Sequence, residues 1–295
     1  MSEQLGFIGT GNLGGAIVSA LLKAGFPVTI HDTDPKVLAP LRDQGARIAA
    51  SPRAVGDAAA IVFACLPSVE VSKAVAAAPD GVASGKAIEI YAEVSTLGME
   101  AIGAIADSMA RHGIKTLDMP AVGGGGGSGV GEGKMAMIGA GPREAYDRVA
   151  PILGTLTRQL FYAGEKHGLA QVCKVVNAAM AITGLTIACE AMVLGVKAGL
   201  DPQLLLDIVN AGSGRNVTTE ERFARTVLAR KFAGNQLRIA LKDMQLYAET
   251  AHALHVPAFV GANIAEIWQA ANGQDREHLV QFFEGFADIE VKRQS

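Results

Sequence analysis

One lysine lies in a strongly apolar stretch of the sequence, where a charged side chain is unexpected. Lys174 stands in Val172-Cys173-Lys174-Val175-Val176-Asn177, and mainly apolar residues follow. Burial disfavours a charged amine, so we expect a pKa lowered toward neutrality, which suits proton exchange with a substrate near pH 7. Asn177 lies three residues later, so both side chains share one helix face. The alternative is a structural lysine, whose stem covers apolar surface or whose amine pairs with a buried carboxylate.

A turn near the start of the chain has the spacing of a nucleotide-binding loop. Gly9-Thr10-Gly11-Asn12-Leu13-Gly14 reads G-x-G-x-x-G, follows an apolar run and opens a helical pattern. The first glycine permits a tight turn, the second lets the backbone approach a pyrophosphate, and the third lets helix and strand pack closely. The pyrophosphate is expected at the helix N-terminus, beside Asn12 and Leu13. A tight turn without a ligand is the alternative.

Asp32 follows the second apolar run and lies 18 residues after Gly14. A carboxylate here accepts hydrogen bonds from a ribose 2′-hydroxyl and repels a 2′-phosphate, so NAD is expected and NADP is disfavoured. The stretch HDTDP contains no arginine that could receive a phosphate, and Arg42 and Arg47 lie well downstream. In the alternative, Asp32 only caps the following turn or helix.

These residues require elements that position them, and the first half of the chain alternates apolar runs with helical patterns. The runs are 5–8, 26–31, 60–66, 87–92 and 114–117, and the clearest helical patterns are 13–24, 68–77 and 98–112. This alternation predicts a parallel sheet covered by helices on both faces. After residue 165 the pattern predicts helices alone, at 167–198, 202–210, 217–230, 238–254, 258–271 and 275–287. We therefore expect an α/β domain at 1–164 and an all-α domain at 165–295.

The composition excludes several classes of protein. Of 295 residues 49% are hydrophobic, the net charge is −3, and no basic block supports nucleic-acid or membrane-surface binding. Only 15 uncharged residues separate Lys174 from Glu190, fewer than the roughly 20 that span a bilayer, so a buried helix is expected there. The sequence has no signal-peptide pattern and no metal-ligand spacing. Its cysteines, Cys65, Cys173 and Cys189, lie far apart, which predicts a cytoplasmic protein with reduced, buried thiols.

Several motifs in order resemble the β-hydroxyacid dehydrogenase family, which includes 3-hydroxyisobutyrate dehydrogenase and tartronate semialdehyde reductase. The resemblance covers nearly the whole chain. It rests on FIGTGNLG at the start, CLP at 65–67, EVST at 93–96, DMPAVGG at 118–124, GLAQVCKVVN at 168–177 and LKDM at 241–244. It implies a Rossmann dinucleotide-binding domain and an all-α domain for substrate and oligomerisation, joined by one long helix. Because such an apolar helix needs partner surfaces, we expect a homodimer or homotetramer.

The resemblance implies roles for individual residues. Lys174 falls on the catalytic lysine, and Asn177 on the asparagine one turn later. Gly123 and Gly124 fall where backbone amides hold a substrate carboxylate. The positions where the family lines the nicotinamide ribose are occupied by Leu66, Pro67 and Thr96. Lys242 falls on a lysine that the family has close to the nicotinamide and substrate. A solvated surface lysine is the alternative for Lys242.

The segment 118–134, DMPAVGGGGGSGVGEGK, holds much of the chain's glycine: ten of 35 glycines lie between Gly123 and Gly141. Glycine runs are often flexible linkers, but this one ends well before the expected domain boundary. In the family this turn faces the nicotinamide, and its bare amides form an anion-binding concavity. We therefore expect the mouth of an active site, with a mobile surface loop as the alternative for Gly125–Gly133.

The sequence departs from the family at three positions, which bear on the substrate. Val122 stands where the family has a substrate-binding serine, Ala170 replaces a glycine before the lysine, and Glu93 stands where aspartate is common. Losing a hydroxyl contact to a charged group costs about 1.5–3 kcal/mol. Either the substrate lacks the partner group, or another donor such as Ser128 replaces it.

These observations predict an NAD-dependent oxidoreductase that interconverts a small β-hydroxy acid and its semialdehyde or keto form. Lys174 would act as the general acid or base, while Asn177 would orient the substrate or the lysine. One alternative is an aldehyde, ketone or imine reductase of the same fold, acting on substrates without a carboxylate. Another is a dinucleotide-binding protein without turnover.

Overall fold

The computed structural model describes residues 3–123, 129–130, 134–157, 159–232, 236–272 and 277–293. Contacts divide the chain into two compact units, Met1–Lys174 and Val175–Ser295, and each is described by itself. The division lies inside one helix, α7 (Leu169–Lys197), which begins in the first unit and continues in the second. The predicted boundary between residues 164 and 165 lies just before this helix.

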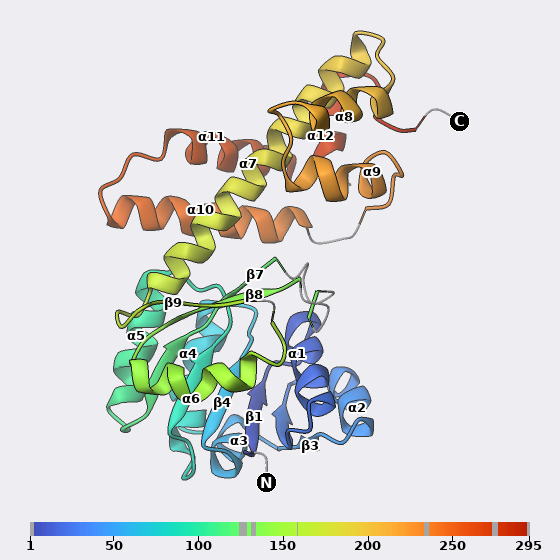
Figure 1. The fold of residues 1–295 in the computed structure, drawn as a ribbon. Helices are drawn as coiled ribbons and strands as arrows, with labels where there is room; N and C mark the ends of the chain where they lie inside the picture. Colours follow the sequence, from blue (N-terminus) through green and yellow to red (C-terminus); the bar gives the residue numbers. More distant parts are fainter. Residues whose placement is uncertain are drawn as a thin grey trace. The chain divides into compact units, whose positions relative to one another are not determined.

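The first unit is built on a sheet with the strand order β3-β2-β1-β4-β5-β6-β8-β7, and β9 pairs with β8 (Figure 1). The strands from β3 to β6 are parallel, whereas β8 is antiparallel to β6 and β7. The strands are β1 Leu5–Ile8, β2 Val28–His31, β3 Arg47–Ile48, β4 Ile61–Ala64, β5 Ile90–Glu93, β6 Lys115–Asp118, β7 Ala121–Val122, β8 Ala136–Ala140 and β9 Gln159–Gly164. The order reverses between β1 and β4, and open parallel sheets bind ligands beyond the carboxyl ends of the strands at such a point.

Helices cover both faces of this sheet, as the alternation predicts. One face packs against α1, α2 and α6 and the other against α3, α4 and α5 (Figure 1). These helices are α1 Asn12–Lys23, α2 Pro35–Asp43, α3 Pro52–Ala58, α4 Val69–Ala77, α5 Met99–Ala110 and α6 Arg143–Leu153. Phe7 and Phe63 lie in the first core and Ile8 and Val62 in the second, because successive strand residues point to opposite faces. The predicted fold class is confirmed.

Local sequence explains where several helices begin. Asp34, Ser51 and Ser68 each accept a hydrogen bond from a backbone N–H at the start of α2, α3 and α4. Such caps satisfy N–H groups that have no partner inside the helix. α1 differs, because its N-cap residue is Gly11 and no side chain caps it. This helix N-terminus is therefore available to an anion.

Two strands in the region after residue 134, β8 and β9, are not predicted by apolar runs. β8 reads AMIGA, and its small residues give a weak strand signal, although all five residues are buried. β9 alternates exposed and half-buried residues rather than forming an apolar run. These strands are defined by pairing with each other and with β6 and β7, which a local pattern does not reveal.

The described residues of the second unit form helices and connecting loops, with no strand. Its helices are the later part of α7, α8 Pro202–Ala211, α9 Phe223–Thr226, α10 Gln236–Ala253, α11 Phe259–Ala271 and α12 Leu279–Ala287. Two apolar clusters hold them together: one joins α7 to α8, α9 and α12, and the other joins α7 to α10, α11 and α12. Trp268 is buried in the second cluster, where its indole N–H donates to Thr186 Oγ1 of α7 at 2.8 Å.

The single regular helix predicted over 217–230 is present only in part. A π-helical turn, Thr218–Arg222, leads into the short helix α9, and the chain then leaves the helical path at Arg230, whose φ is +52°. The Asn216 carboxamide accepts hydrogen bonds from the N–H groups of Thr218 and Thr219, which fixes the start of this turn. Side-chain bonds of this kind compete with regular helix and are not visible in apolar periodicity.

Most of α7 is less buried than predicted. By length and composition this helix could cross a membrane, but only a third of its most apolar 18-residue window is buried. Met180, Ile187 and Leu194 are 74%, 54% and 72% exposed. The prediction of three buried thiols is also wrong, because only Cys189 is buried, while Cys173 of α7 is exposed. Exposed apolar surface of this extent is typical of an interaction site.

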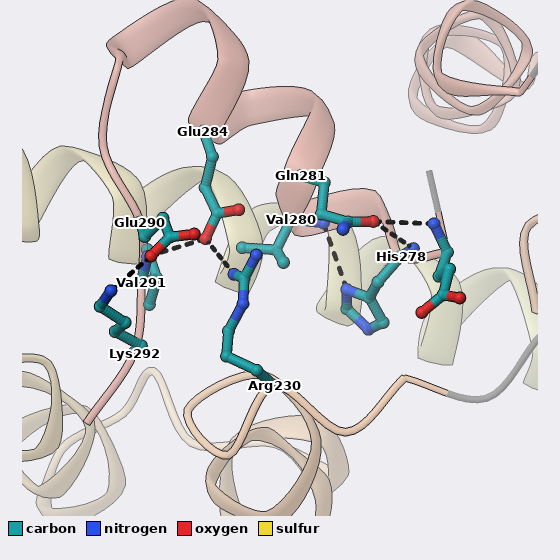
Figure 2. Close-up of polar contacts among 9 residues, drawn as sticks. Arg230, His278, Val280, Gln281, Glu284, Glu290, Val291 and Lys292 are labelled. Carbon is teal, nitrogen blue, oxygen red and sulfur yellow. Dashed lines mark hydrogen bonds and ion pairs between the residues drawn. The ribbon is translucent and has the colours of Figure 1, made fainter. Parts of the chain in front are cut away.

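Polar contacts fasten the chain's last described segment to the second unit (Figure 2). The buried Glu284 of α12 accepts a hydrogen bond from the Arg230 guanidinium at 2.6 Å and another from the Val291 N–H at 2.7 Å. His278 caps α12, with Nδ1 accepting from the Val280 N–H at 3.2 Å. Burial, and then the nearby positive charge of Arg230, lower the pKa of His278 to about 4.

The depressed pKa of His278 predicts that acid weakens the second unit. Its usual pKa is 6.5, so the fold gains full stability from the neutral ring above that pH. Stability is lost as the pH falls toward 4, because the unfolded chain then binds a proton that the folded chain refuses. His278→Asn keeps a capping acceptor and should flatten this part of the profile.

Urea unfolding followed by Trp268 fluorescence reports on the second unit, because this is the chain's one tryptophan. The loss of unfolding free energy between pH 7.5 and pH 5 should be smaller in His278→Asn than in the wild type. An equal loss in the two proteins would contradict the assignment.

Candidate active site

Each of the three glycines in the G-x-G-x-x-G turn is required for a different structural reason. Gly9 has a φ of +85°, and a Cβ there would lie 2.2 Å from the Cys65 carbonyl oxygen. A Cβ on Gly14 would lie 2.0 Å from the carbonyl oxygen of Gly9, so helix α1 and the turn touch at this point. A Cβ on Gly11 would meet nothing within 4 Å. Gly11 therefore leaves open space at an uncapped helix N-terminus, which fits a pyrophosphate of a dinucleotide.

Asp32 lies beside this turn and holds it. Its Oδ2 accepts hydrogen bonds from the Thr10 N–H at 2.7 Å and the Thr10 hydroxyl at 3.3 Å. Its Oδ1 accepts from the Asp34 N–H at 3.0 Å, so the carboxylate also forms the turn that leads into α2. The half-exposed carboxylate thus lies beside the glycine turn at Thr10, where it suits a ribose 2′-hydroxyl and its charge disfavours a 2′-phosphate.

The segments after β4 and β5 reach the same edge of the sheet. Leu66 and Pro67 follow β4, and Thr96 follows β5. The Leu66 N–H donates to Ser95 Oγ at 2.7 Å, which joins the two segments directly. The structure therefore brings Leu66, Pro67 and Thr96 to the carboxyl edge that also carries the glycine turn.

The glycine-rich segment begins and ends in neighbouring strands. Ala121 and Val122 pair with β8 in antiparallel register, and Gly123 has a φ of +84° with a Cβ that would lie 2.7 Å from the Lys134 carbonyl oxygen. A connection between adjacent strands of one sheet is not a linker between domains. Gly124, Ser128 and most of Gly125–Gly133 lie outside the described residues, so their predicted roles stay predictions.

Two of the positions that depart from the family share one apolar cluster. Ala170 is fully buried in the first turn of α7 with Ile138 and Ala140 of β8. Val122 and Leu169 pack against the same cluster. The valine at the family's serine position therefore helps to seat the start of α7 against β8, and its side chain forms an apolar contact there.

Two buried carboxyl groups at this edge are not among the predicted site residues. Glu93 and Asp118 end β5 and β6, and they are register partners in adjacent parallel strands. Glu93 accepts hydrogen bonds from the Tyr91 hydroxyl at 2.8 Å and the Ser95 N–H at 3.0 Å. Burial raises the pKa of Glu93 to about 7 and that of Asp118 to about 6, although their hydrogen bonds oppose this. The sequence signal that could have found them is an acidic residue at the last position of a predicted strand.

Asp118 and Gln171 fix the start of α7. Asp118 Oδ2 accepts from the N–H groups of Gly168 and Gln171, each at 3.1 Å, and its Oδ1 accepts from Gln171 Nε2 at 2.7 Å. A carboxylate from β6 thus caps a helix fifty residues further along the chain. Gln171 in turn bonds to backbone groups of the segment that follows β5.

The predicted catalytic residues lie on the first turns of α7. Lys174 is half-buried, between the exposed Cys173 and the buried Val175, rather than enclosed by apolar groups as predicted. Asn177 is exposed one turn further on. The predicted lowering of the Lys174 pKa stays a prediction.

Lys242 belongs to α10 of the second unit, where its Nζ lies 3.2 Å from Asp243 Oδ1. The predicted place of this lysine beside the nicotinamide therefore stays a prediction.

Comparisons with known proteins agree with this arrangement. The NAD-binding domain of 6-phosphogluconate dehydrogenase matches residues 4–164, and the NAD-binding model of NADP-dependent 3-hydroxyisobutyrate dehydrogenase matches residues 168–281. The chain is 31% identical to 3-hydroxyisobutyrate dehydrogenase of Pseudomonas aeruginosa, over 93% of this chain and 94% of the relative. It is 29% identical to L-threonate dehydrogenase of Cupriavidus necator, over 97% of both.

The fold also matches solved structures. The 3-hydroxyisobutyrate dehydrogenase of Mycobacterium tuberculosis with L-serine superposes with a TM-score of 0.84 at 23% identity, over 96% of this chain and 99% of that one. The chain belongs to the β-hydroxyacid dehydrogenase family. It is an NAD-binding oxidoreductase that acts on CH–OH groups.

The different surroundings of Gly11 and Gly14 predict different effects of the same substitution. Gly11→Ala should leave thermal unfolding nearly unchanged and weaken NAD⁺ binding at least tenfold, because the added methyl enters the space reserved for the pyrophosphate. Gly14→Ala should lower the unfolding temperature by several degrees, because its methyl collides with the Gly9 carbonyl.

Gly103→Ala is the matched control, because a Cβ at this half-buried position of α5 also meets nothing within 4 Å. It should keep both the stability and the NAD⁺ affinity, measured by thermal unfolding and by titration calorimetry. Unchanged NAD⁺ affinity in Gly11→Ala would contradict the role given to this glycine.

Proposed function

We propose that this protein is an NAD-dependent dehydrogenase that interconverts a small β-hydroxy acid and its semialdehyde or keto form. The observation that carries the proposal is that the glycine turn, Asp32 and Thr96 share one sheet edge, to which the helix bearing Lys174 is hydrogen-bonded. The named relatives act on 3-hydroxyisobutyrate and L-threonate, which are small hydroxy acids. The same substrate class is proposed for this chain.

The chemistry divides between the cofactor and the chain. A bound nicotinamide cofactor supplies the hydride acceptor or donor. Lys174 takes the hydroxyl proton during oxidation, or gives a proton to the carbonyl oxygen during reduction, and Asn177 orients the substrate or the lysine. Backbone amides at Gly123 and Gly124 hold the substrate carboxylate in this proposal, and Lys242 takes the role of the family's lysine toward the nicotinamide and substrate.

NAD is the proposed cofactor in preference to NADP. The Asp32 carboxylate lies at the glycine turn, held there by Thr10, and it can accept hydrogen bonds from a ribose 2′-hydroxyl. A 2′-phosphate at the same place would meet a negative charge. Leu66, Pro67 and Thr96 line the nicotinamide ribose in this proposal.

A second candidate, a reductase of aldehydes, ketones or imines without a carboxylate, is favoured by one observation. Val122 offers an apolar side chain to its cluster where the family has a substrate-binding hydroxyl. Lys174 argues against the imine substrates of this candidate, because an amine that exchanges protons suits a substrate oxygen.

The test is NAD⁺ reduction at 340 nm with a panel of small β-hydroxy acids and matched neutral alcohols. We expect activity confined to the acids, with NAD⁺ preferred over NADP⁺ by tenfold or more in kcat/KM. Equal or better rates on the neutral alcohols would replace the first candidate by the second. A tenfold preference for NADP⁺ would overturn the role of Asp32.

The role of Lys174 predicts a loss of turnover without a loss of fold. Lys174→Met keeps the length of the side chain and should lower kcat by two or more decades, with thermal unfolding and NAD⁺ affinity near those of the wild type. Lys166→Met, outside the helix, is the control and should keep its activity. Turnover of Lys174→Met within threefold of the wild type would end the catalytic role.

We also propose a cytoplasmic homodimer or homotetramer that uses the exposed stripe of α7. Met180, Ile187 and Leu194 are spaced by seven residues, which keeps them on nearly one face of the helix. Burial of this stripe by a second copy accounts for an apolar helix that its own unit leaves largely exposed.

The stripe can be tested with one added charge. Leu194→Glu should convert the assembly to single chains in light scattering at micromolar concentration, because the carboxylate would be buried without a partner. Lys36→Glu, on the exposed side of α2, should not change the mass. A wild-type protein that scatters as a single chain would contradict the proposal.

A further inference from the structure

Gln171 uses every hydrogen-bonding group of its side chain. Its two N–H bonds donate to Asp118 Oδ1 at 2.7 Å and to the Ser95 carbonyl oxygen at 3.1 Å. Its oxygen accepts from the Leu97 N–H at 2.9 Å and the Gly98 N–H at 3.1 Å. A carboxamide has two donors and two acceptor sites, so none is left over. The side chain is fully buried, so each bond offsets a desolvation cost.

These bonds join residues 95–98 to the first turn of α7, and the proposed reaction requires a fixed distance between these two segments. Ser95, Leu97 and Gly98 surround Thr96, which is proposed to line the nicotinamide ribose. Gln171 lies three residues before Lys174, so the two side chains are neighbours on the helix surface. The helix rises by about 1.5 Å per residue, and the orientation of Lys174 is thus set within one turn of the fastened residue.

Asp118 supports the same geometry from the other side. It accepts the N–H groups of Gly168 and Gln171 as well as the Gln171 carboxamide, so it fixes both the start of the helix and the rotamer of the glutamine. An apolar side chain of similar volume could fill this space, but it would not define the direction of the helix through hydrogen bonds. The hydrogen bonds of Asp118 and Gln171 therefore suit positioning of the start of α7 better than filling of space in the core.

We propose that Gln171 and Asp118 are positioning residues, which hold the amine of Lys174 at a fixed place relative to the cofactor-binding segment 95–98. This inference rests on the proposed function of Lys174. Small displacements of a proton-transfer group cost large factors in rate, so loosening this contact lowers turnover even when the fold and the cofactor affinity survive.

The experiment is a double-mutant cycle between Gln171→Met and Lys174→Met. Gln171→Met keeps the length of the side chain and removes all four hydrogen bonds. We expect it to lower kcat at least tenfold in the wild-type background while changing the NAD⁺ dissociation constant less than threefold. In the Lys174→Met background it should lower kcat by less than twofold, because a residue that acts through Lys174 has nothing left to position.

Asp118→Asn is a second variant, which keeps the size of the side chain. Its effect on kcat is measured in the same way, with and without Lys174→Met. Thr186→Val is the matched control for stability: it removes the hydrogen bond to Trp268 from the same helix, far from this contact, and should keep kcat. Lost activity that tracks a lowered unfolding temperature in all three variants would overturn the proposal.

If Gln171→Met lowers kcat by the same factor in the wild-type and Lys174→Met backgrounds, Gln171 has a structural role only. If Gln171→Met leaves kcat unchanged, Gln171 has no role in turnover. Both results overturn the positioning role. Failure of the proposed function is seen separately, as wild-type turnover in Lys174→Met alone.

Discussion

The requirement that buried polar groups find partners organises the site of this protein. Asp118 and Gln171 are both fully buried, and each satisfies the other while fastening α7 to the ends of β5 and β6. Without these bonds the first turn of α7 would have free N–H groups next to a buried carboxylate. The place of Lys174 depends on this contact, since the lysine follows within one helical turn.

The same constraint explains the cofactor side of the edge. Thr10 at the glycine turn donates to Asp32, and the Leu66 N–H donates to Ser95, whose own N–H bonds to Glu93. Side-chain oxygens thereby connect the loop after β1 to the loop after β2, and the loop after β4 to the loop after β5. Gly11 borders open space at the N-terminus of α1, where no side chain caps the helix. A ligand with hydrogen-bond acceptors can therefore bind the backbone N–H groups there.

The helical unit follows a different principle, because its long helix has more apolar surface than its own neighbours cover. Ala179, Ile182 and Leu185 pack into the cluster around Trp268, whereas Met180 and Ile187 point elsewhere. A helix that is apolar on all sides is usually enclosed, and a single copy of this unit does not enclose it. The apolar contact of Val122 with the start of α7 is a second place where this chain uses apolar packing instead of a hydroxyl.

Local periodicity and spacing in the sequence predict the alternation of strands and helices, the glycine turn, Asp32 after the second strand, and the helical second half. The sequence also placed Lys174 and Asn177 on one helix. It did not reveal β8 and β9, whose strand character comes from pairing, nor the broken helix after Asn216, where side chains bond to the backbone. The capping of α7 by Asp118 and the link from Gln171 to residues 95–98 are visible only in the folded chain, because hydrogen bonds across fifty or more residues leave no periodic trace in a sequence.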